Sequence, residues 1–282
     1  MSALVLLPDE IAAFQDDIWS FYRANGREFA WRGISDPYAV LVSEMMLQQT
    51  QTLRVAAKYD AWMRDFPTVQ SLAAAARSDV LAHWVGLGYN RRAVFLHEAC
   101  KAVCAEHDGI FPHAQEELRA LPGIGPYTAG AVSTFAYNQP NVFIETNIRS
   151  VFIHRFFSDD ALADGSRKID DREIAPLVEQ TLDRTNPREW YYALMDYGAD
   201  LKKKVANPAR KSRQYARQSR FEGSLRQARG AILRFLARNG TATLAQVAKA
   251  EGIDIARIER AAEKLLAERM VAARGGEFRI AD

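Results

Sequence analysis

Apolar residues recur at helical spacing through most of the first 200 residues. Between Asp9 and Tyr22, Ile11, Phe14 and Ile18 lie three or four positions apart, as on one face of an α-helix. Residues that favour helix starts precede several such stretches: Ser35 and Asp36 before Pro37, Thr68 before residues 69–75, and Asn186 with Pro187 before residues 189–201. The pattern predicts a mainly α-helical protein.

The pattern changes after about Val205, where polar and basic residues interrupt the helical face until Leu225. Beyond that point it predicts helices to Arg238, over 244–251 and over 255–269. Residues 271–273 and 278–280 suit two short strands joined at Gly275 and Gly276, a typical hairpin turn. Three helices and a hairpin in this order resemble a winged helix, a relative of the helix-turn-helix.

Composition sets broad limits. The chain has 282 residues, enough to bury more than one core, and its 48% hydrophobic and 26% charged residues are ordinary for a globular protein. No apolar run approaches the roughly 20 residues that span a bilayer, and Leu4–Leu7 lacks the flanks of a secretory signal. We therefore expect no membrane association and a cytoplasmic location.

The net charge of +2 hides an uneven distribution. A run without carboxylates between Leu201 and Arg220 contains Lys202, Lys203, Lys204, Arg210, Lys211, Arg213, Arg217 and Arg220. Such a run is either a phosphate-binding surface or a solvated basic linker.

The two cysteines predict neither a metal site nor a disulfide framework. Cys100 and Cys104 lie one helical turn apart in an apolar stretch, and no further cysteine completes a ligand set. They are expected to be small core residues.

The most informative motif is Leu-Pro-Gly-Ile-Gly-Pro-Tyr-Thr-Ala-Gly-Ala over residues 121–131. Gly123 and Gly125 permit backbone angles and close approach that a side chain would prevent. Amides at the start of the following helix then favour an anion such as a phosphate, a contact that positions DNA without reading its sequence. A Gly-x-Gly turn alone fits a plain helix–helix connection equally well.

The full string resembles the hairpin of helix-hairpin-helix DNA glycosylases, closest to the MutY-type adenine glycosylases. Further segments follow in the family's order: Phe-Ala-Trp-Arg at 29–32, Pro-Tyr-Ala-Val-Leu-Val-Ser-Glu-Met-Met-Leu-Gln-Gln-Thr-Gln at 37–51, Gly-Leu-Gly-Tyr-Asn-Arg-Arg-Ala at 86–93 and Phe-Ile-Glu-Thr-Asn-Ile-Arg at 143–149. The resemblance covers roughly residues 10 to 202.

The resemblance implies a two-lobed helical HhH-GPD glycosylase fold. We expect a terminal-helix lobe of residues 1–34 plus 150–205, a helical barrel with the hairpin over 35–149, a basic linker over 206–222 and a winged-helix-like domain over 223–282. The implied partner is double-stranded DNA with a mismatched or damaged base, bound by a monomer.

Excision of a base needs two acidic groups. One protonates the departing base, and the other stabilises positive charge developing on the sugar. By resemblance Glu44 is the acid; its apolar neighbours, among them Val42 and Met45, favour a desolvated carboxyl with a raised pKa. The alternative for a lone helical glutamate is a surface position.

Glu145 stands where the family carries an aspartate. It can still stabilise the cation, but the extra methylene moves the carboxylate by roughly a bond length, whereas catalytic groups tolerate errors of about 0.5 Å. The departure leaves open a different substrate or a decayed site. Asn147 is expected to orient this carboxylate, to bind the sugar-phosphate, or to cap a helix.

Tyr127 indicates the reaction type. Strand-cleaving members of the family carry a lysine there, whose amine forms a Schiff base with the sugar. A phenol forms no such adduct, which predicts a monofunctional hydrolase that leaves an abasic site.

DNA contacts follow from the need to extrude the base. By resemblance Gln49 lies beside the lesion, and Leu87 or Tyr89 wedges into the base stack, although both also suit plain core packing. The other expected DNA contacts are Gly123, Gly125, Thr128, Arg149, Lys202, Lys203, Arg210 and Lys211.

Two features of many relatives are missing. The four cysteines of their iron-sulfur cluster are absent after residue 200, so no cofactor is expected, and the chain is too short for the domain that recognises 8-oxoguanine. Adenine opposite 8-oxoguanine is the leading substrate, with a thymine or uracil mismatch or a modified base as alternatives. A non-catalytic damage sensor and a winged-helix transcription regulator are readings from other classes.

Overall fold

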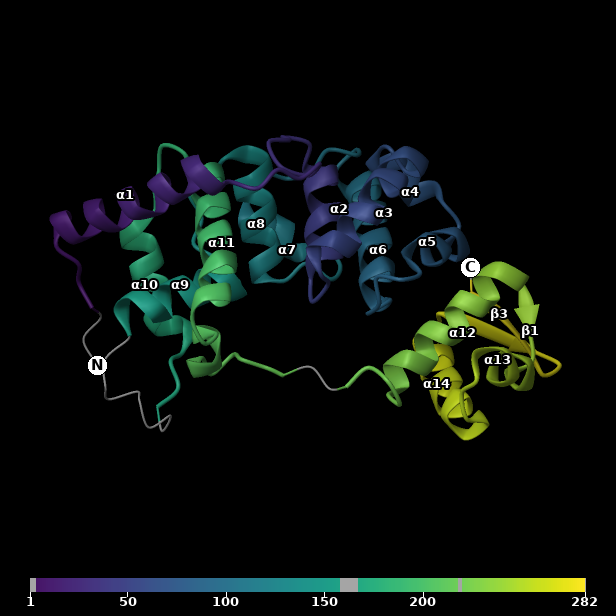
Figure 1. Cartoon of the computed structure of the whole chain (residues 1–282). Coiled ribbons are helices and arrows are strands. Elements are labelled where there is room, and N and C mark those ends of the chain that lie inside the picture. Colours follow the sequence, from purple (N-terminus) through teal and green to yellow (C-terminus); the bar gives the residue numbers. More distant parts are fainter. Residues whose placement is uncertain (1–3, 158–166, 218–219, 282) are drawn as a thin grey trace. The chain divides into compact units, whose positions relative to one another are not determined.

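The computed structural model describes residues 4–157, 167–217 and 220–281, and it is mainly helical, as predicted (Figure 1). The helices up to residue 157 are α1 (Pro8–Asn25), α2 (Pro37–Leu47), α3 (Thr52–Asp65), α4 (Val69–Ala74), α5 (Arg77–Trp84), α6 (Arg91–Glu106), α7 (Gln115–Ala120), α8 (Pro126–Tyr137) and α9 (Thr146–Phe156). The later helices are α10 (Asp171–Thr181), α11 (Pro187–Lys204), the 3-10 helix η2 (Pro208–Lys211), α12 (Leu225–Asn239), α13 (Leu244–Glu251) and α14 (Ile255–Ala267). The strands are β1 (Thr241–Ala242), β2 (Val271–Arg274) and β3 (Glu277–Ile280).

The chain forms two compact units, each made of several segments. The first unit comprises residues 1–40, 113–119 and 125–217; the second comprises 41–112, 120–124 and 218–282. The boundaries of these two units differ from those of the four expected segments, which stay a prediction.

In the first unit, α1, α9, α10 and α11 surround an aromatic core. The ring of Phe14 lies 5.4 Å from that of Phe152 and 6.0 Å from that of Trp190. The helix ends are set locally: Pro8 starts α1, and the Asp170 side chain accepts a hydrogen bond from Arg172 N at the start of α10. This core holds α9 and α11, which carry the candidate residues Asn147, Arg149, Lys202 and Lys203; Glu145 is the N-cap of α9.

In the second unit, α2 from Leu41 onward joins α3–α6 around a second core. Trp62 and Trp84 meet edge-on with ring centroids 5.5 Å apart, and both are buried. Thr68 caps α4, as predicted, by accepting a hydrogen bond from Ser71 N. Cys100 is fully buried, as expected of a core residue, whereas Cys104 is only half-buried, because it lies at the edge of the core.

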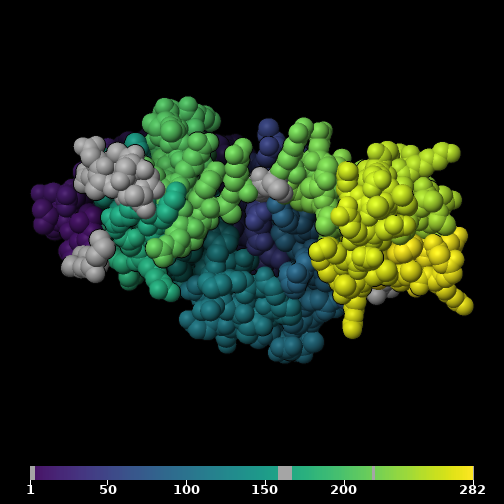
Figure 2. Space-filling view, turned by 90° about the horizontal axis from the view of Figure 1, so that it is seen from below, coloured from purple at the N-terminus to yellow at the C-terminus, as the bar shows by residue number. Residues whose placement is uncertain are grey.

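Residues 225–281 follow the predicted order of helices and strands and form the compact yellow body of Figure 2. The caps are Ser224, Thr243 and Asp254, whose side chains accept hydrogen bonds from backbone amides of the first turns. The predicted hairpin is confirmed: β2 pairs with β3 across Gly275 and Gly276, both at positive φ, and β1 adds to the other edge of β3. The winged-helix resemblance itself stays a prediction.

The expected basic linker begins with ordered structure. η2 packs on α9. Ile169 donates from its backbone N to Lys211 O and accepts at its backbone O from Arg213 N, which forms a bridge between Ile169 and Ser212. Its first residues therefore belong with the first unit, because they pair with its backbone. Residues 218 and 219 of the expected linker lie outside the described residues.

Residues 4–157, 167–217 and 220–281 contain neither a candidate membrane span nor a candidate metal site. None of the helices there is long and apolar enough to cross a membrane. Within the same residues, no group of three or more His, Cys, Asp or Glu side chains is placed to hold a metal ion.

Candidate active site

Glu44 lies in the last turn of α2, in the second unit. It is 6% exposed, and its neighbours Val42, Met45 and Met46 are almost completely buried. A surface position for this glutamate is thereby ruled out. A carboxyl group in apolar surroundings suits a general acid, because desolvation disfavours its charged form.

The chain after Glu44 is held by a buried guanidinium. Arg92, at the start of α6 and 7% exposed, donates from Nη1 to the carbonyls of Met45 and Gln48, both at 2.6 Å. Its Nη2 donates to Gly88 O at 2.9 Å and to Thr50 Oγ1 at 3.1 Å. One side chain thus joins the end of α2 and the loop after it to the loop at residues 86–89.

Sequence reasoning missed Arg92, although a signal was present. Arg92 falls on the apolar face of its helix, in line with Leu96, Cys100 and Val103, which are all fully buried. A cation on a core face must find partners inside. Burial lowers the pKa of Arg92 to about 10, so the group stays charged at pH 7.

The predicted DNA contacts of this unit differ in exposure. Gln49 is exposed at φ 54°, and Tyr89 is half-buried at φ 47° with its hydroxyl accepting from Arg226 Nη1 at 2.6 Å. Leu87 is 3% exposed, so its side chain packs in the core, which was one of its two predicted settings. Left-handed backbone at non-glycine residues is uncommon and concentrates at functional loops.

The two glycines of the hairpin have different local reasons. Gly123 has φ 72°, and a Cβ there would lie 2.3 Å from Phe95 Cβ, so the fold itself requires glycine. Gly125 caps α8 at φ −86°, and a Cβ there would meet nothing within 4 Å. Gly125 is therefore open to the close approach of a ligand, as a phosphate contact requires.

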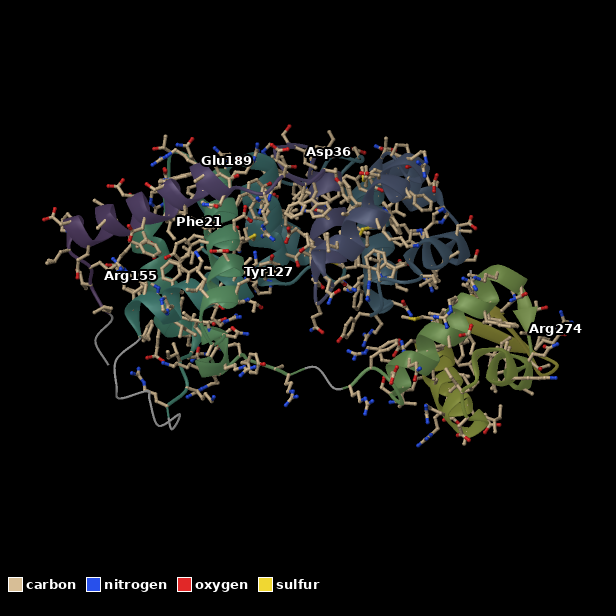
Figure 3. The ribbon with its side chains drawn as sticks, viewed as in Figure 1. Phe21, Asp36, Tyr127, Arg155, Glu189 and Arg274 are labelled. Carbon is tan, nitrogen blue, oxygen red and sulfur yellow. The ribbon has the colours of Figure 1, made fainter. Side chains whose placement is uncertain are left out.

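The residues after the hairpin lie at the start of α8. The ring of Tyr127 (Figure 3) meets that of Phe143 edge-on, with centroids 5.8 Å apart. The Thr128 side chain is 3% exposed. A DNA contact at Thr128 would accordingly involve its backbone rather than its hydroxyl.

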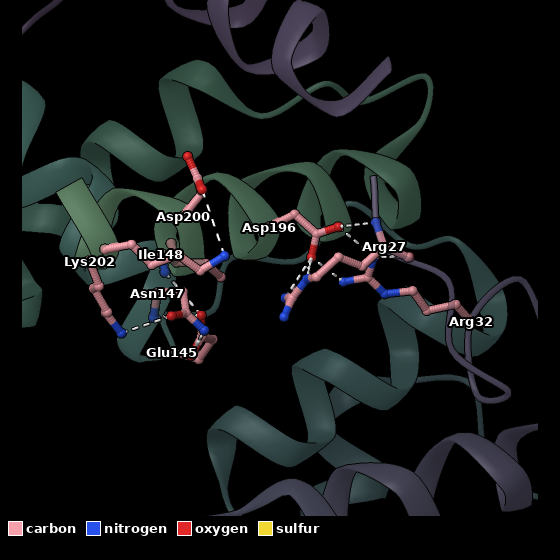
Figure 4. Close-up of polar contacts among 9 residues, drawn as sticks. Arg27, Arg32, Glu145, Asn147, Ile148, Asp196, Asp200 and Lys202 are labelled. Atoms are coloured by element: carbon pink, nitrogen blue, oxygen red, sulfur yellow. Dashed lines mark hydrogen bonds and ion pairs between the residues drawn. The ribbon is translucent and has the colours of Figure 1, made fainter. Parts of the chain in front are cut away.

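Glu145, in the first unit, is the N-cap of α9 (Figure 4). Its Oε1 accepts hydrogen bonds from Asn147 N at 2.6 Å and Ile148 N at 3.0 Å. Burial raises the pKa of Glu145, and the Ile148 amide, the charge of Lys202 and Asn147 offset this only in part. The carboxylate is thus fixed in place but incompletely neutralised.

Asn147 is not a helix cap, since that position belongs to Glu145. It lies in the first turn of α9, where its Nδ2 donates to Glu145 Oε2 at 3.3 Å. Of the roles predicted for Asn147, the structure matches the one that orients the carboxylate.

Lys202, at the end of α11, donates from Nζ to Asn147 Oδ1 at 2.8 Å (Figure 4). The approach is close because Gly198 lies one turn earlier, where a Cβ would come within 2.4 Å of Asn147 O. Glu145, Asn147 and Lys202 therefore form one hydrogen-bonded group. The sequence signal for it was a glycine inside a helix, which marks close backbone packing.

The other basic candidates of this unit have separate surroundings. Arg149 pairs with Asp171 at 2.7 Å, and Lys203 lies 3.8 Å from Asp200. Arg210 is exposed and Lys211 half-buried, both in η2. Their roles in DNA binding stay predictions.

Asp196 anchors the predicted segment at residues 29–32. Arg32 donates to both of its carboxylate oxygens at 2.7 and 2.8 Å, and Arg27 donates from Nε and from its backbone N (Figure 4). The Asp196 side chain is 1% exposed. This cluster fixes the chain before α2 onto α11, a structural role that sequence reasoning did not assign.

Residues 42–173, which include Glu44, the hairpin and Glu145, match the family model described as HhH-GPD superfamily base excision DNA repair protein. This segment matches the HhH-GPD superfamily.

Among curated proteins, this chain is 37% identical over 187 residues to an adenine DNA glycosylase of Mycobacterium tuberculosis, covering 66% of this chain and 60% of that protein. It is 35% identical over 202 residues to the adenine DNA glycosylase of Homo sapiens, covering 68% of this chain and 36% of the human protein. The chain thus spans less than two thirds of the length of these relatives.

Among solved structures, this chain is similar to a thermostable thymine-DNA glycosylase, with TM-score 0.59 and 25% identity over 67% of this chain and 86% of that one. A trapped endonuclease III–DNA covalent intermediate has TM-score 0.55 and 17% identity over 68% of this chain and 85% of that one. The second likeness shows the fold alone, and that fold is the predicted one.

Proposed function

We propose that this protein is a DNA glycosylase of base excision repair that removes adenine from a mismatch, such as adenine opposite 8-oxoguanine. The observation that carries the proposal is Glu44, 6% exposed in the apolar helix α2 within the family segment. The curated relatives named adenine DNA glycosylase support the choice of base.

In the proposed reaction Glu44 protonates the departing base, and Glu145 stabilises the positive charge that develops on the sugar. The burial of Glu44 in α2 supports its assignment to the first task. An incompletely neutralised carboxylate suits the second. Asn147 holds Glu145, while Gly125 provides the open backbone approach for a phosphate.

The test is base release from duplexes of defined sequence. Purified protein is incubated with A:8-oxoG, A:G, T:G and U:G duplexes and with matched controls, and abasic sites are revealed by alkali. We expect release of adenine by the intact protein and a loss of at least about 100-fold in Glu44→Gln, the size typical for a general acid. Release that survives Glu44→Gln would contradict the proposed role.

A second candidate is a thymine mismatch glycosylase, favoured by the likeness to the thermostable thymine-DNA glycosylase at 25% identity. The same panel separates the two, because release from T:G rather than from A:8-oxoG selects thymine. No release from any duplex, with retained binding, would select a non-catalytic damage sensor.

We also propose that the enzyme is monofunctional. By resemblance, Tyr127 corresponds to the Schiff-base lysine of strand-cleaving relatives, and a phenol forms no such adduct. Borohydride added during the reaction is expected to trap no protein–DNA adduct. A stable adduct that disappears on substitution of one lysine would overturn this.

The C-terminal segment is proposed to add DNA contacts. Because η2 packs on α9, a truncation should begin after Arg217 rather than at residue 206. We expect weaker DNA binding and a flatter dependence of the affinity on salt, since fewer phosphates are neutralised. Equal affinity and an equal salt slope in the truncated protein would contradict this.

A further inference from the structure

Lys202 is set apart from the residues that follow it on α11. Lys203 and Lys204 are exposed and lie near the Asp200 carboxylate, at 3.8 and 2.6 Å. Lys202 is half-buried, and its Nζ reaches Asn147 in the first turn of α9. Lys203 and Lys204 thus lie at the surface, whereas Lys202 is part of the hydrogen-bonded group of Glu145.

This direction is fixed by helix packing. Lys202 follows Gly198 by one helical turn and so lies on the same face of α11. Gly198 brings the α11 backbone against Asn147, with a Cβ position only 2.4 Å from Asn147 O. The lysine stem therefore runs alongside the start of α9, and its ammonium ends at Asn147 Oδ1.

The ammonium fixes the orientation of the Asn147 amide. A lysine only donates hydrogen bonds, so Oδ1 must face it and Nδ2 must face the other way, toward Glu145 Oε2 at 3.3 Å. Backbone amides hold Oε1 of the same carboxylate. Both carboxylate oxygens are thereby positioned, one by the α9 backbone and one through Lys202.

Charged side chains lie on α9 itself, whose N-cap is Glu145, and on α10, α11 and η2, which pack against α9. α11 contributes Lys202, α9 contributes Arg149, which is paired with Asp171 of α10, and η2 carries Arg210 and Lys211. Lys202 is the charged group whose field lowers the pKa of Glu145 against the effect of burial. Burial in turn lowers the pKa of Lys202, and Glu145 partly restores it.

We propose that Lys202 is a positioning residue of the base-excision reaction: through Asn147 it holds the Glu145 carboxylate in one orientation and in its ionised form, instead of binding a DNA phosphate. This inference deepens the proposed function and rests on it. It replaces the predicted DNA-contact role of Lys202.

The experiment measures single-turnover base release by the full chain from an A:8-oxoG duplex across pH 5 to 9. Lys202→Met should lower the rate about 10- to 100-fold, as is typical for groups that orient a reacting residue through another side chain. Its acid limb should move to higher pH, because loss of the positive charge raises the pKa of Glu145. Lys202→Arg should restore much of the rate. Lys101→Met, which removes one charge near Glu98 on α6, is the matched control and should behave as wild type.

Binding separates positioning from phosphate contact. Lys202→Met should leave the DNA dissociation constant and its salt slope unchanged, whereas loss of a phosphate contact would reduce the slope by about one. In an Asn147→Ala background, Lys202→Met should lower the rate little further, because the lysine acts through that amide. Additive losses would overturn the inference.

Further outcomes also decide it. A reduced slope with an unchanged rate would make Lys202 a phosphate contact. A lower thermal midpoint with no shift of the acid limb would make it merely structural. Wild-type protein that releases no base would overturn the proposed function and this inference together; active wild-type protein with an unaffected Lys202→Met would overturn this inference alone.

Discussion

The carboxylates of Asp196, on α11, and Glu145, at the start of α9, differ in how far their surroundings compensate the negative charge. Asp196 receives hydrogen bonds from Arg27 and Arg32 on both oxygens; burial opposes its ionisation, but the arginines prevail and lower its pKa. Glu145 receives backbone amides and an amide side chain backed by Lys202, and its pKa remains raised by burial.

The difference separates holding a fold from performing chemistry. A saturated carboxylate stabilises its surroundings and has little left to offer a ligand. An incompletely neutralised one retains an electrostatic potential that a cationic transition state can use. The two hairpin glycines differ in a similar way: a Cβ at Gly123 would meet Phe95, so the fold needs glycine there, whereas the space beside Gly125 is open to a ligand.

The largest expected effect is at Asp196. Asp196→Ala leaves the buried Arg32 guanidinium without its carboxylate and should lower the free energy of unfolding by about 3 to 5 kcal/mol. Urea unfolding measures it. Asp200→Ala, which removes a half-buried carboxylate with lysine partners from the same helix, is the control and should change the midpoint far less. Equal losses in the two variants would contradict the special role of Asp196.

The next effect is at the hairpin. Gly123→Ala places a Cβ against Phe95 at φ 72° and should lower the free energy of unfolding by about 2 kcal/mol. Gly125→Ala should leave unfolding unaltered but weaken DNA binding, measured by fluorescence anisotropy. Equal destabilisation by both substitutions would show that Gly125 is also required by the fold.

A smaller effect of opposite sign is expected at Glu145. Glu145→Gln should abolish base release while raising the free energy of unfolding at pH 7 by about 1 kcal/mol, because a buried charge is removed from a site that serves function over stability. Thermal and urea unfolding check the sign. A less stable Glu145→Gln protein would place Glu145 with Asp196 as a structural carboxylate.

The smallest effect is on the pH dependence of stability. The folded pKa of Asp196 lies below its unfolded value, so its stabilisation is present above about pH 4 and is lost as the pH falls through the folded pKa. Glu145 has a raised folded pKa, so its contribution is lost as the pH rises through it. Asp196→Asn should make the free energy of unfolding depend less on pH below about pH 4. Glu145→Gln should raise the free energy of unfolding near neutral pH.

Local features of the fold were predictable because their causes are local. The bounds of α13 match the expected 244–251, since Thr243 and Gly252 cap it from both ends. The hairpin of β2 and β3 follows from Gly275 and Gly276. The order of the helices and the family segment at residues 42–173 followed from short motifs in the same way.

The candidate site was predictable only in part. Asn147 was open to a capping role, because spacing alone does not reveal that Glu145 reaches the amides first. Lys202 was grouped with its basic neighbours, since its partner lies 55 residues away in sequence. Whether Leu87 wedges into DNA or packs in the core depended on burial, which periodicity in a loop does not report.

Arg92 has a consequence for variation in this protein. Since one guanidinium holds both the segment after Glu44 and the loop before α6, those two loops share a single cooperative opening event, visible as correlated amide hydrogen exchange at residues 48–50 and 87–89. A substitution in either loop is then felt by the other. We therefore expect substitutions in the two loops to have non-additive effects, so that the loops vary as one epistatic unit rather than as two independent sites.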